Sequence, residues 1–260
     1  MIKTKKLSQQ FYLLHDEADC FASLILGEKR ALLFDTACGV DDLKQAVEAI
    51  TSLPLLVIAS HGHFDHIGGS GQFDTVYLSE KDWNLLESYE EEQIRQWVKE
   101  MSPGREPLFC WKEWKTIRKL DFTHFDLGNL EGEIVELPGH TEGSIGVYLP
   151  KWKVLLSGDA LTPVMCLFFQ NHGTKETQLR TLCSVQQMDL EYYLTSHSEK
   201  KMPKSLISRM IRCIEHSEGK RHYAYAYPKP PYSKGWFYLD SLEEEAVGII
   251  VEKKPEGRVV

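Results

Sequence analysis

Hydrophobic residues in this chain gather into short runs separated by Gly, Pro, Asp and Asn, and such runs predict buried β-strands. The runs 21–26 and 30–34 are joined at 27–29 by Gly, Glu and Lys, which predicts a β-hairpin. Pro54 restarts a strand that continues to Ala59. Later strands are expected over 75–78, 133–137, 144–149, 153–157, 192–196 and 246–251.

Other segments carry apolar residues at helical spacing. Over 41–50 an acidic start precedes Leu43 and Val47, and negative charge suits the first turn of a helix. The segments 179–188 and 205–216 show the same spacing. Because strands and helices alternate along the chain, we expect an α/β fold, and 260 residues are enough for a single domain over 1–260.

Two regions depart from this alternation. Between about 80 and 120 the pattern becomes helical and rich in tryptophan, which predicts a helical insertion that could cover a site as a lid. Trp97 in this insertion is expected either to line a substrate pocket or to pack the insertion onto the core. From about 220 to 260 the chain is aromatic and rich in proline, which predicts a C-terminal extension.

A dense group of polar side chains follows the strand that Pro54 begins. The segment is His61-Gly62-His63-Phe64-Asp65-His66. Imidazole and carboxylate groups are ligands for Zn, Mn and Fe, and a loop leaving a buried strand can turn several of them toward one point. The sequence therefore predicts a metal site.

Further donors come directly after other predicted strands. His140 follows 133–137, Asp159 follows 153–157, and His197 follows 192–196. Since active sites of layered α/β folds collect at strand ends, we expect these side chains to meet the first group. Together the five histidines and two aspartates are enough donors for two cations, with a carboxylate left to bridge them.

This order of ligands resembles the signature of the metallo-β-lactamase superfamily, and the segments 139–144 and 157–160 resemble the sequences that flank it. The resemblance implies a four-layer αβ/βα sandwich, in which two packed mixed β-sheets are flanked by helices. By position it also implies a role for each residue: His61, His63 and His140 hold the first metal, Asp65, His66 and His197 hold the second, Asp159 bridges them, and Asp35 orients ligands from behind.

The resemblance further implies a metallo-hydrolase that uses two divalent ions, Zn in the first place and Mn or Fe otherwise. Two cations lower the pKa of a water held between them, so that a bridging hydroxide can attack a carbonyl or phosphoryl group. Asp65 would be both ligand and catalytic proton acceptor. The expected substrate is a small ester, lactone, thioester or phosphoester, and its pocket is expected to include Phe168, Phe169 and His172 as well as Trp97.

The metal signature alone leaves the reaction open. The motifs resemble those of the glyoxalase II and lactonase groups, but the segment 160–169 differs from the glyoxalase II group, which argues against a glutathione thioester. An iron-dependent oxidoreductase similar to persulfide dioxygenases is an alternative on the same scaffold. An inactive binding protein is a second alternative, although all seven ligand positions are retained.

Composition narrows the expected partners to a small-molecule substrate. A net charge of −8 gives no basic footprint for nucleic acid, and no segment has the length and hydropathy of a membrane span. The N-terminal residues precede no apolar signal region, and the six cysteines show no paired spacing, so we expect a cytoplasmic protein with reduced thiols. Cys166 is a thiol that could face the site, and a homodimer is left open.

Overall fold

The computed structural model describes residues 1–106, 114–217, 222–228, 233–241 and 246–253. Two large mixed sheets dominate it. The first contains, in spatial order, β1 (Lys3–Lys6), β2 (Phe11–His15), β3 (Phe21–Leu26), β4 (Ala31–Phe34), β5 (Leu55–Ile58), β6 (Val76–Leu78) and β7 (Ile117–Lys119). The second contains β14 (Met202–Pro203), β13 (Tyr192–Leu194), β11 (Val154–Leu156), β10 (Ile145–Leu149), β9 (Glu131–Glu136) and β8 (His124–Asp126).

The two sheets pack face to face around one apolar core. Phe11, Ile25 and Phe34 of the first sheet meet Val147 and Leu156 of the second, and all five side chains are almost completely buried. Removing this apolar surface from water is the main force that holds the two sheets together.

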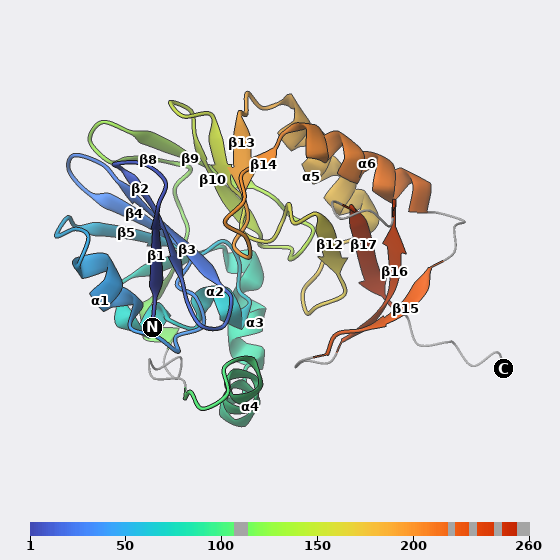
Figure 1. Cartoon of the computed structure of the whole chain (residues 1–260), viewed down its shortest axis with the longest axis horizontal. Coiled ribbons are helices and arrows are strands. Elements are labelled where there is room, and N and C mark those ends of the chain that lie inside the picture. The colour runs from blue at the N-terminus through green and yellow to red at the C-terminus, as the bar shows by residue number, and fades with distance from the viewer. Residues whose placement is uncertain (107–113, 218–221, 229–232, 242–245, 254–260) are drawn as a thin grey trace.

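Helices cover the outer face of each sheet (Figure 1). On the first sheet, α1 (Leu43–Glu48) buries Leu43 and Val47 against Leu33 and Val57. On the second sheet, α5 (Lys175–Gln187) and α6 (Ser205–Ser217) bury apolar side chains against the core strands. The order helix, sheet, sheet, helix confirms the expected four-layer αβ/βα sandwich.

A third, smaller sheet was not expected from the sequence. It has the order β12 (Val164–Leu167), β17 (Gly248–Glu252), β16 (Lys234–Leu239) and β15 (Tyr223–Ala226). β12 pairs in parallel with β17, so Val164 lies opposite Gly248 and Leu167 opposite Val251. This pairing places the aromatic C-terminal segment beside the residues that follow Asp159, as the right side of Figure 1 shows.

Among its described residues, the segment expected to be a helical insertion contains two α-helices, α3 (Trp83–Ser88) and α4 (Glu91–Met101), and β7 near its end belongs to the first sheet. The helix breaks at Tyr89, whose backbone is extended and whose hydroxyl donates to the Gly62 carbonyl at 3.1 Å. Ile94 and Val98 of α4 pack against Phe64. Residues 107–113 of this segment lie outside the described part of the chain.

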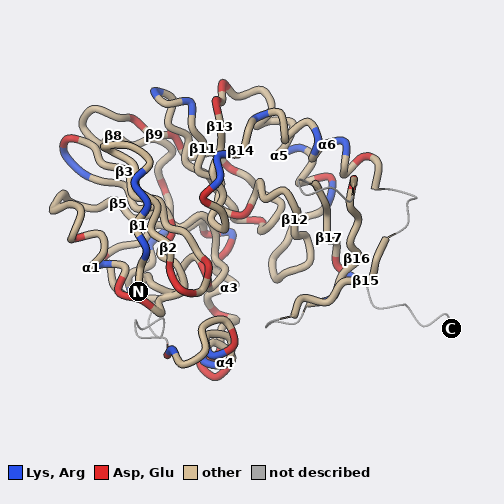
Figure 2. The backbone as a smooth tube through the Cα atoms, viewed as in Figure 1, with Lys and Arg blue, Asp and Glu red and all other residues tan. Residues whose placement is uncertain are grey.

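Charged residues of both signs are distributed over the surface elements, with lysines along β1 and both signs on α4 (Figure 2). Among the described residues, no helix combines the length and the hydropathy that crossing a membrane requires. The five cysteines in the described part of the chain are all free thiols.

Candidate metal centre

The predicted ligands meet at one edge of the sandwich, in the segments that follow four strands, with Asp65 and His66 on the short helix α2 (Phe64–Ile67). His61 follows β5 of the first sheet, whereas His140, Asp159 and His197 follow β9, β11 and β13 of the second. The loops are fixed to each other by backbone hydrogen bonds, including Ile145 N to Ser60 O at 2.8 Å and Phe21 N to Ser196 O at 2.9 Å. The sandwich itself therefore brings side chains distant in sequence to one place.

Three imidazoles form the first cluster. His63 Nδ1 lies 3.0 Å from His61 Nε2 and 3.0 Å from His140 Nε2. Four ligands arranged as a tetrahedron around zinc, at Zn–N distances of about 2.0–2.1 Å, stand about 3.3 Å apart, so this spacing fits a common cation.

The ring nitrogens that point away from the first cluster make hydrogen bonds, and these bonds determine which nitrogen of each ring faces the cluster. His63 Nε2 donates to the Gln170 carbonyl at 3.1 Å, and His140 Nδ1 donates to the Cys166 carbonyl at 3.1 Å. His63 Nδ1 and His140 Nε2 consequently point lone pairs at each other, an arrangement that a cation between them would stabilise.

Two carboxylates and two imidazoles form the second cluster. His197 Nε2 lies 3.4 Å from Asp65 Oδ2 and 3.3 Å from Asp159 Oδ2, and His66 Nε2 lies 3.6 Å from Asp65 Oδ2 and 3.7 Å from Asp159 Oδ1. Asp159 also reaches the first cluster, since its Oδ2 is 3.8 Å from His140 Nε2. The Asp159 carboxylate thus lies between the two clusters, as a bridging ligand requires.

The carboxylates of the second cluster concentrate negative charge, which a bound cation would neutralise. Burial alone would lower the pKa of His66, but the charges of Asp65, Asp159 and Asp35 raise it to about 10. In the first cluster burial and neighbouring imidazoles lower the pKa of His140 to about 3, so that ring is neutral and able to ligate. His66 Nε2 and Asp159 Oδ1 are buried without a hydrogen-bond partner. Since buried polar atoms are normally paired, these two atoms fit a metal site.

Asp35 lies directly behind the ligands. Its Oδ1 accepts from Ser60 N at 2.6 Å, and its Oδ2 accepts from Ser196 Oγ at 2.6 Å, from Ser60 Oγ at 3.1 Å and from His66 Nδ1 at 3.0 Å. Ser60 Oγ in turn accepts from His61 Nδ1 at 2.9 Å. One buried carboxylate thereby orients a histidine of each cluster, and the two serines are contributors that the sequence pattern did not single out.

Asp82 is a second buried carboxylate at the site, and sequence reasoning missed it because it stands in a charged run before α3. Its Oδ2 accepts from Gly62 N at 2.9 Å and Thr141 Oγ1 at 2.8 Å, and its Oδ1 accepts from Gly143 N at 2.9 Å and Asn171 Nδ2 at 2.6 Å. A Cβ at Gly143 would stand 2.5 Å from Asp82 Cγ, so the loop approaches this closely only with glycine. Asp82 ties the loop of His61 and His63 to the loop of His140.

We expect Asp82→Asn to weaken metal binding at the first cluster and to lower the free energy of unfolding by roughly 2–6 kcal/mol. The amide nitrogen would face N–H donors, and each of two donors left unpaired costs about 1–3 kcal/mol. Urea denaturation and competition with a chromogenic chelator measure both effects. Asp74→Asn, at an exposed carboxylate nearby in sequence, is the matched control, and equal behaviour of the two variants would contradict the role given to Asp82.

Aromatic side chains flank the first cluster. The Phe169 ring centre lies 5.8 Å from that of His63 and 6.0 Å from that of His140, and the tilted ring of Phe168 packs on Phe169 at 4.3 Å. Tyr227, from the loop after β15, reaches the Phe169 ring at 5.1 Å. Burial and, to a smaller extent, the charge of Asp65 raise the pKa of Tyr227. The C-terminal segment therefore contributes to the wall of the site, which sequence reasoning missed.

The contacts of Trp97 and His172 are with residues outside the ligand set. Trp97 packs edge to face on Phe64 at 5.2 Å, within the apolar cluster beneath α4. His172 Nδ1 contacts the carbonyl of the next residue, and its Nε2 lies 3.7 Å from Glu252. The Cys166 thiol donates to the Val164 carbonyl at 3.6 Å, and the carbonyl of Cys166 accepts from His140 Nδ1 at 3.1 Å.

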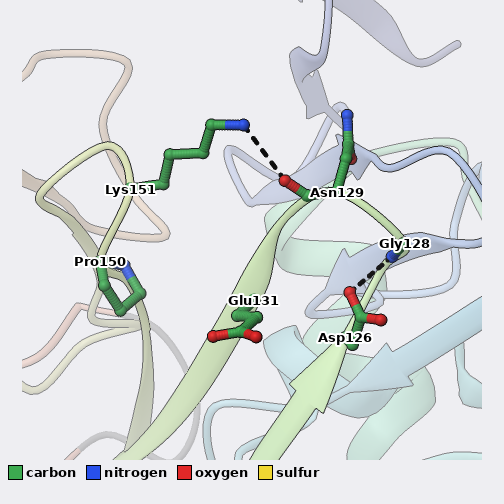
Figure 3. A pocket seen from close by; sticks show the side chains of 6 residues that line it. All are labelled: Asp126, Gly128, Asn129, Glu131, Pro150 and Lys151. Atoms are coloured by element: carbon green, nitrogen blue, oxygen red, sulfur yellow. Dashed lines mark hydrogen bonds between the residues drawn. The ribbon is translucent and has the colours of Figure 1, made fainter.

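A separate hollow of about 370 Å³ lies at the opposite ends of the strands, between the turns before β9 and β11. Lys151 Nζ spans it to the Asn129 carbonyl at 3.2 Å, and the Asp126 carboxylate accepts from Gly128 N (Figure 3). Glu131 at its edge begins β9, whereas His140 follows the end of that strand. The hollow is therefore remote from the metal ligands.

The sequence carries the signature of a known family. The family model described as "Metallo-beta-lactamase superfamily" matches residues 15–197, a span that includes all seven ligand positions. The chain belongs to the metallo-β-lactamase superfamily, which confirms the resemblance drawn from its motifs.

Individual proteins of known name share only a moderate part of this sequence. The chain is 26% identical over 175 residues to "Acyl-coenzyme A thioesterase MBLAC2" of Homo sapiens, a match covering 60% of this chain and 62% of that protein. It is 31% identical over 140 residues to "Hydroxyacylglutathione hydrolase GloC" of Haemophilus influenzae, covering 52% of this chain and 62% of that protein. The matches thus span about 62% of the length of both relatives.

The fold is shared with solved structures. "Metallo-beta-lactamase from Pontibacter korlensis" superposes with a TM-score of 0.60 and 18% identity, over 84% of this chain and 100% of that one. "Crystal Structure of DIM-1 metallo-beta-lactamase" gives a TM-score of 0.58 and 16% identity over 84% of this chain and 98% of that chain. At these identities the likeness concerns the fold.

Proposed function

We propose that this chain is a hydrolase dependent on two divalent metal ions, in the first place zinc, and that it cleaves the thioester bond of a small acyl substrate. The observation that carries the proposal is the convergence of five histidines and two aspartates on two adjacent points, with His66 Nε2 and Asp159 Oδ1 buried and unpaired. Such a site suits hydrolysis, because the bound ions would activate a water and polarise the scissile carbonyl.

The chain's own residues supply positioning and proton transfer. His61, His63 and His140 would hold one ion and Asp65, His66 and His197 the other, with Asp159 between them. The Asp65 side chain is 23% exposed and therefore borders the space a substrate enters. Burial alone would raise its pKa, but the charges of His66 and His197 lower it, which keeps the carboxylate ionised. An ionised carboxylate beside the ligands would accept a proton from the attacking water. It would then deliver this proton to the departing thiolate.

The thioester class is supported by the relatives and by the aromatic wall. Two relatives are named for hydrolysis of acyl-coenzyme A and of hydroxyacylglutathione, and both compounds are acyl thioesters. Phe168, Phe169 and Tyr227 provide an apolar surface beside the metal ligands, which suits an acyl chain. The net charge of −8 favours a small-molecule substrate over a nucleic acid.

The proposal is tested by assaying purified protein against acyl thioesters beside oxygen esters, lactones and phosphodiesters. Thioester hydrolysis that is lost after chelation and restored by zinc is the expected result. Hydrolysis of another bond class alone would contradict the substrate assignment, and no hydrolysis by protein loaded with zinc would contradict the function.

We expect Phe169→Ala to raise KM for long-chain acyl thioesters about 5–30-fold while leaving acetyl thioesters nearly unchanged. Losing the contact of an aromatic ring with an acyl chain removes about 1–2 kcal/mol of apolar burial, and each 1.4 kcal/mol is about tenfold in affinity. Steady-state kinetics over a series of chain lengths measure this. Phe122→Ala, which removes a ring packed on Tyr77 in the core between the sheets, controls for lost stability, and a KM shift independent of chain length would refute the role.

A further inference from the structure

Two neighbouring thiols belong to none of the ligand motifs, and one of them, Cys20, lies beside the second cluster. Cys20 Sγ is 3.3 Å from Cys38 Sγ, and both side chains are almost completely buried. Cys20 Sγ, a carboxylate oxygen of Asp65 and a ring nitrogen of His197 all lie within 4.8 Å of one another. The sulfur therefore stands beside two of the groups that form the second cluster.

The position of Cys20 is fixed by the same turn that orients His197. The Asp16 carboxylate accepts from Ala18 N and Cys20 N, both at 2.9 Å, and from Cys38 N at 3.2 Å. Within this turn the Asp19 carbonyl accepts from His197 Nδ1 at 3.1 Å. Because one short segment carries both Cys20 and the acceptor of His197, the sulfur and the imidazole are held in a constant relation.

We propose that Cys20 is a further protein ligand of the second metal position, on the side where Asp65 and His197 lie. This inference rests on the proposed metal-dependent function. Two ligand atoms of one cation stand at most about 4.4 Å apart for bonds of about 2.3 Å to sulfur and 2.0–2.1 Å to nitrogen, so the group needs only a small closure. His66 Nε2, which lies 3.6 Å from Asp65 Oδ2, is buried without a hydrogen-bond partner and is an independent indication of a cation site beside Asp65.

A sulfur ligand would determine which metal the position prefers. Thiolate favours Zn and Co over Mn and Mg, which prefer oxygen ligands. On binding, the Cys20 S–H proton leaves to solvent as the sulfur forms its bond to the metal. Cys38 is placed to donate its S–H to the Cys20 sulfur and so to support the thiolate.

A packing role for Cys20 predicts something different. Cys20 and Cys38 also belong to the apolar cluster with Phe64, Ile94 and Val98. If packing were the whole role, replacing Cys20 would change stability alone, and no spectroscopic property of a bound metal would depend on its sulfur. Cobalt substitution separates the two roles, because a thiolate ligand gives an intense sulfur-to-cobalt charge-transfer band in the near ultraviolet.

The test is the absorption spectrum of the full chain loaded with Co²⁺. We expect the charge-transfer band in the unaltered protein, its loss in Cys20→Ser, and its retention in Cys166→Ser and in the exposed control Cys183→Ser. We also expect Cys20→Ser to bind the second Zn²⁺ about 10–100-fold more weakly, or worse, since even residues that only orient ligands contribute that much.

Any other result of the cobalt experiment contradicts the assignment of Cys20 as a metal ligand. Visible cobalt bands without a charge-transfer band would refute the Cys20 ligand while leaving the metal centre intact, whereas failure to take up Co²⁺ would remove the proposed function as well. A charge-transfer band that persists in Cys20→Ser would also refute the Cys20 ligand. Should that variant fail to fold, X-ray absorption of the zinc form of Cys166→Ser decides, because the inference requires a sulfur at about 2.3 Å.

Discussion

Replacing Asp159 by alanine is expected to lower turnover by about 10³-fold or more and to leave a folded protein with less bound metal. The carboxylate lies between the two clusters, with Oδ2 3.8 Å from His140 Nε2 and 3.3 Å from His197 Nε2. Metal charge stabilises the transition state of hydrolysis by several kcal/mol, and each 1.4 kcal/mol is about tenfold in rate. Steady-state kinetics and elemental mass spectrometry on the same sample measure both losses.

A matched control separates the site from a general effect of removing charge. Asp121 is exposed, so Asp121→Ala removes the same side chain from the surface. Circular dichroism of both variants establishes that the fold persists. An Asp159→Ala protein with full activity and a full complement of metal would refute the assignment of Asp159 as the bridging ligand.

The second large effect is expected for Asp35→Asn, which should weaken metal binding by about 10–100-fold and cost roughly 3–5 kcal/mol of stability. The carboxylate accepts from Ser60, Ser196 and His66 and is itself 1% exposed. An amide in its place would direct N–H groups at these donors. The expected loss of metal affinity is typical for residues that orient metal ligands. The expected loss of stability is typical for breaking a buried charged pair.

The order in which metal is lost makes this prediction specific. Asp35 contacts His66 of the second cluster directly, but reaches His61 of the first only through Ser60. We therefore expect Asp35→Asn to lose the ion of the second cluster before that of the first in a chelator titration. Urea denaturation of the same variant measures the loss of stability. Asp121→Asn is the control, and unchanged affinity and stability in Asp35→Asn would show that the carboxylate does not organise the site.

Much of the ligand set was predictable because each ligand has a local sequence signal. His61, His63, Asp65 and His66 are adjacent in the chain, and the other three each follow a recognisable strand. The strands β3 and β5 appeared within a residue or two of their expected bounds, since buried runs ended by turn residues are a strong pattern.

Helix bounds were less accurate because capping side chains decide them. The segment expected from 179 begins at Lys175, where the Thr174 hydroxyl accepts from Thr177 N at 3.1 Å. The helix expected over 41–50 is shortened to Leu43–Glu48, with the Asp42 side chain accepting from Gln45 N at 2.8 Å. Both caps satisfy backbone donors that the first turn leaves unpaired.

What the sequence could not reveal depends on contacts between distant segments. Asp82 stands among charged residues and looks like a surface position, although its backbone donors come from Gly62 and Gly143. Likewise, Tyr227 reaches the site only because β12 pairs with β17 and so brings the C-terminal sheet beside Phe169. No periodicity within a single segment contains that information.

Metal content tests the central claim most directly. We would purify the protein without added metal, determine bound metals by elemental mass spectrometry and assay the same sample with an acyl thioester. The account predicts about two Zn per chain together with thioester hydrolysis that a chelator abolishes. Protein that binds no metal even when supplied with zinc, or that holds a single Fe and hydrolyses nothing, would contradict it.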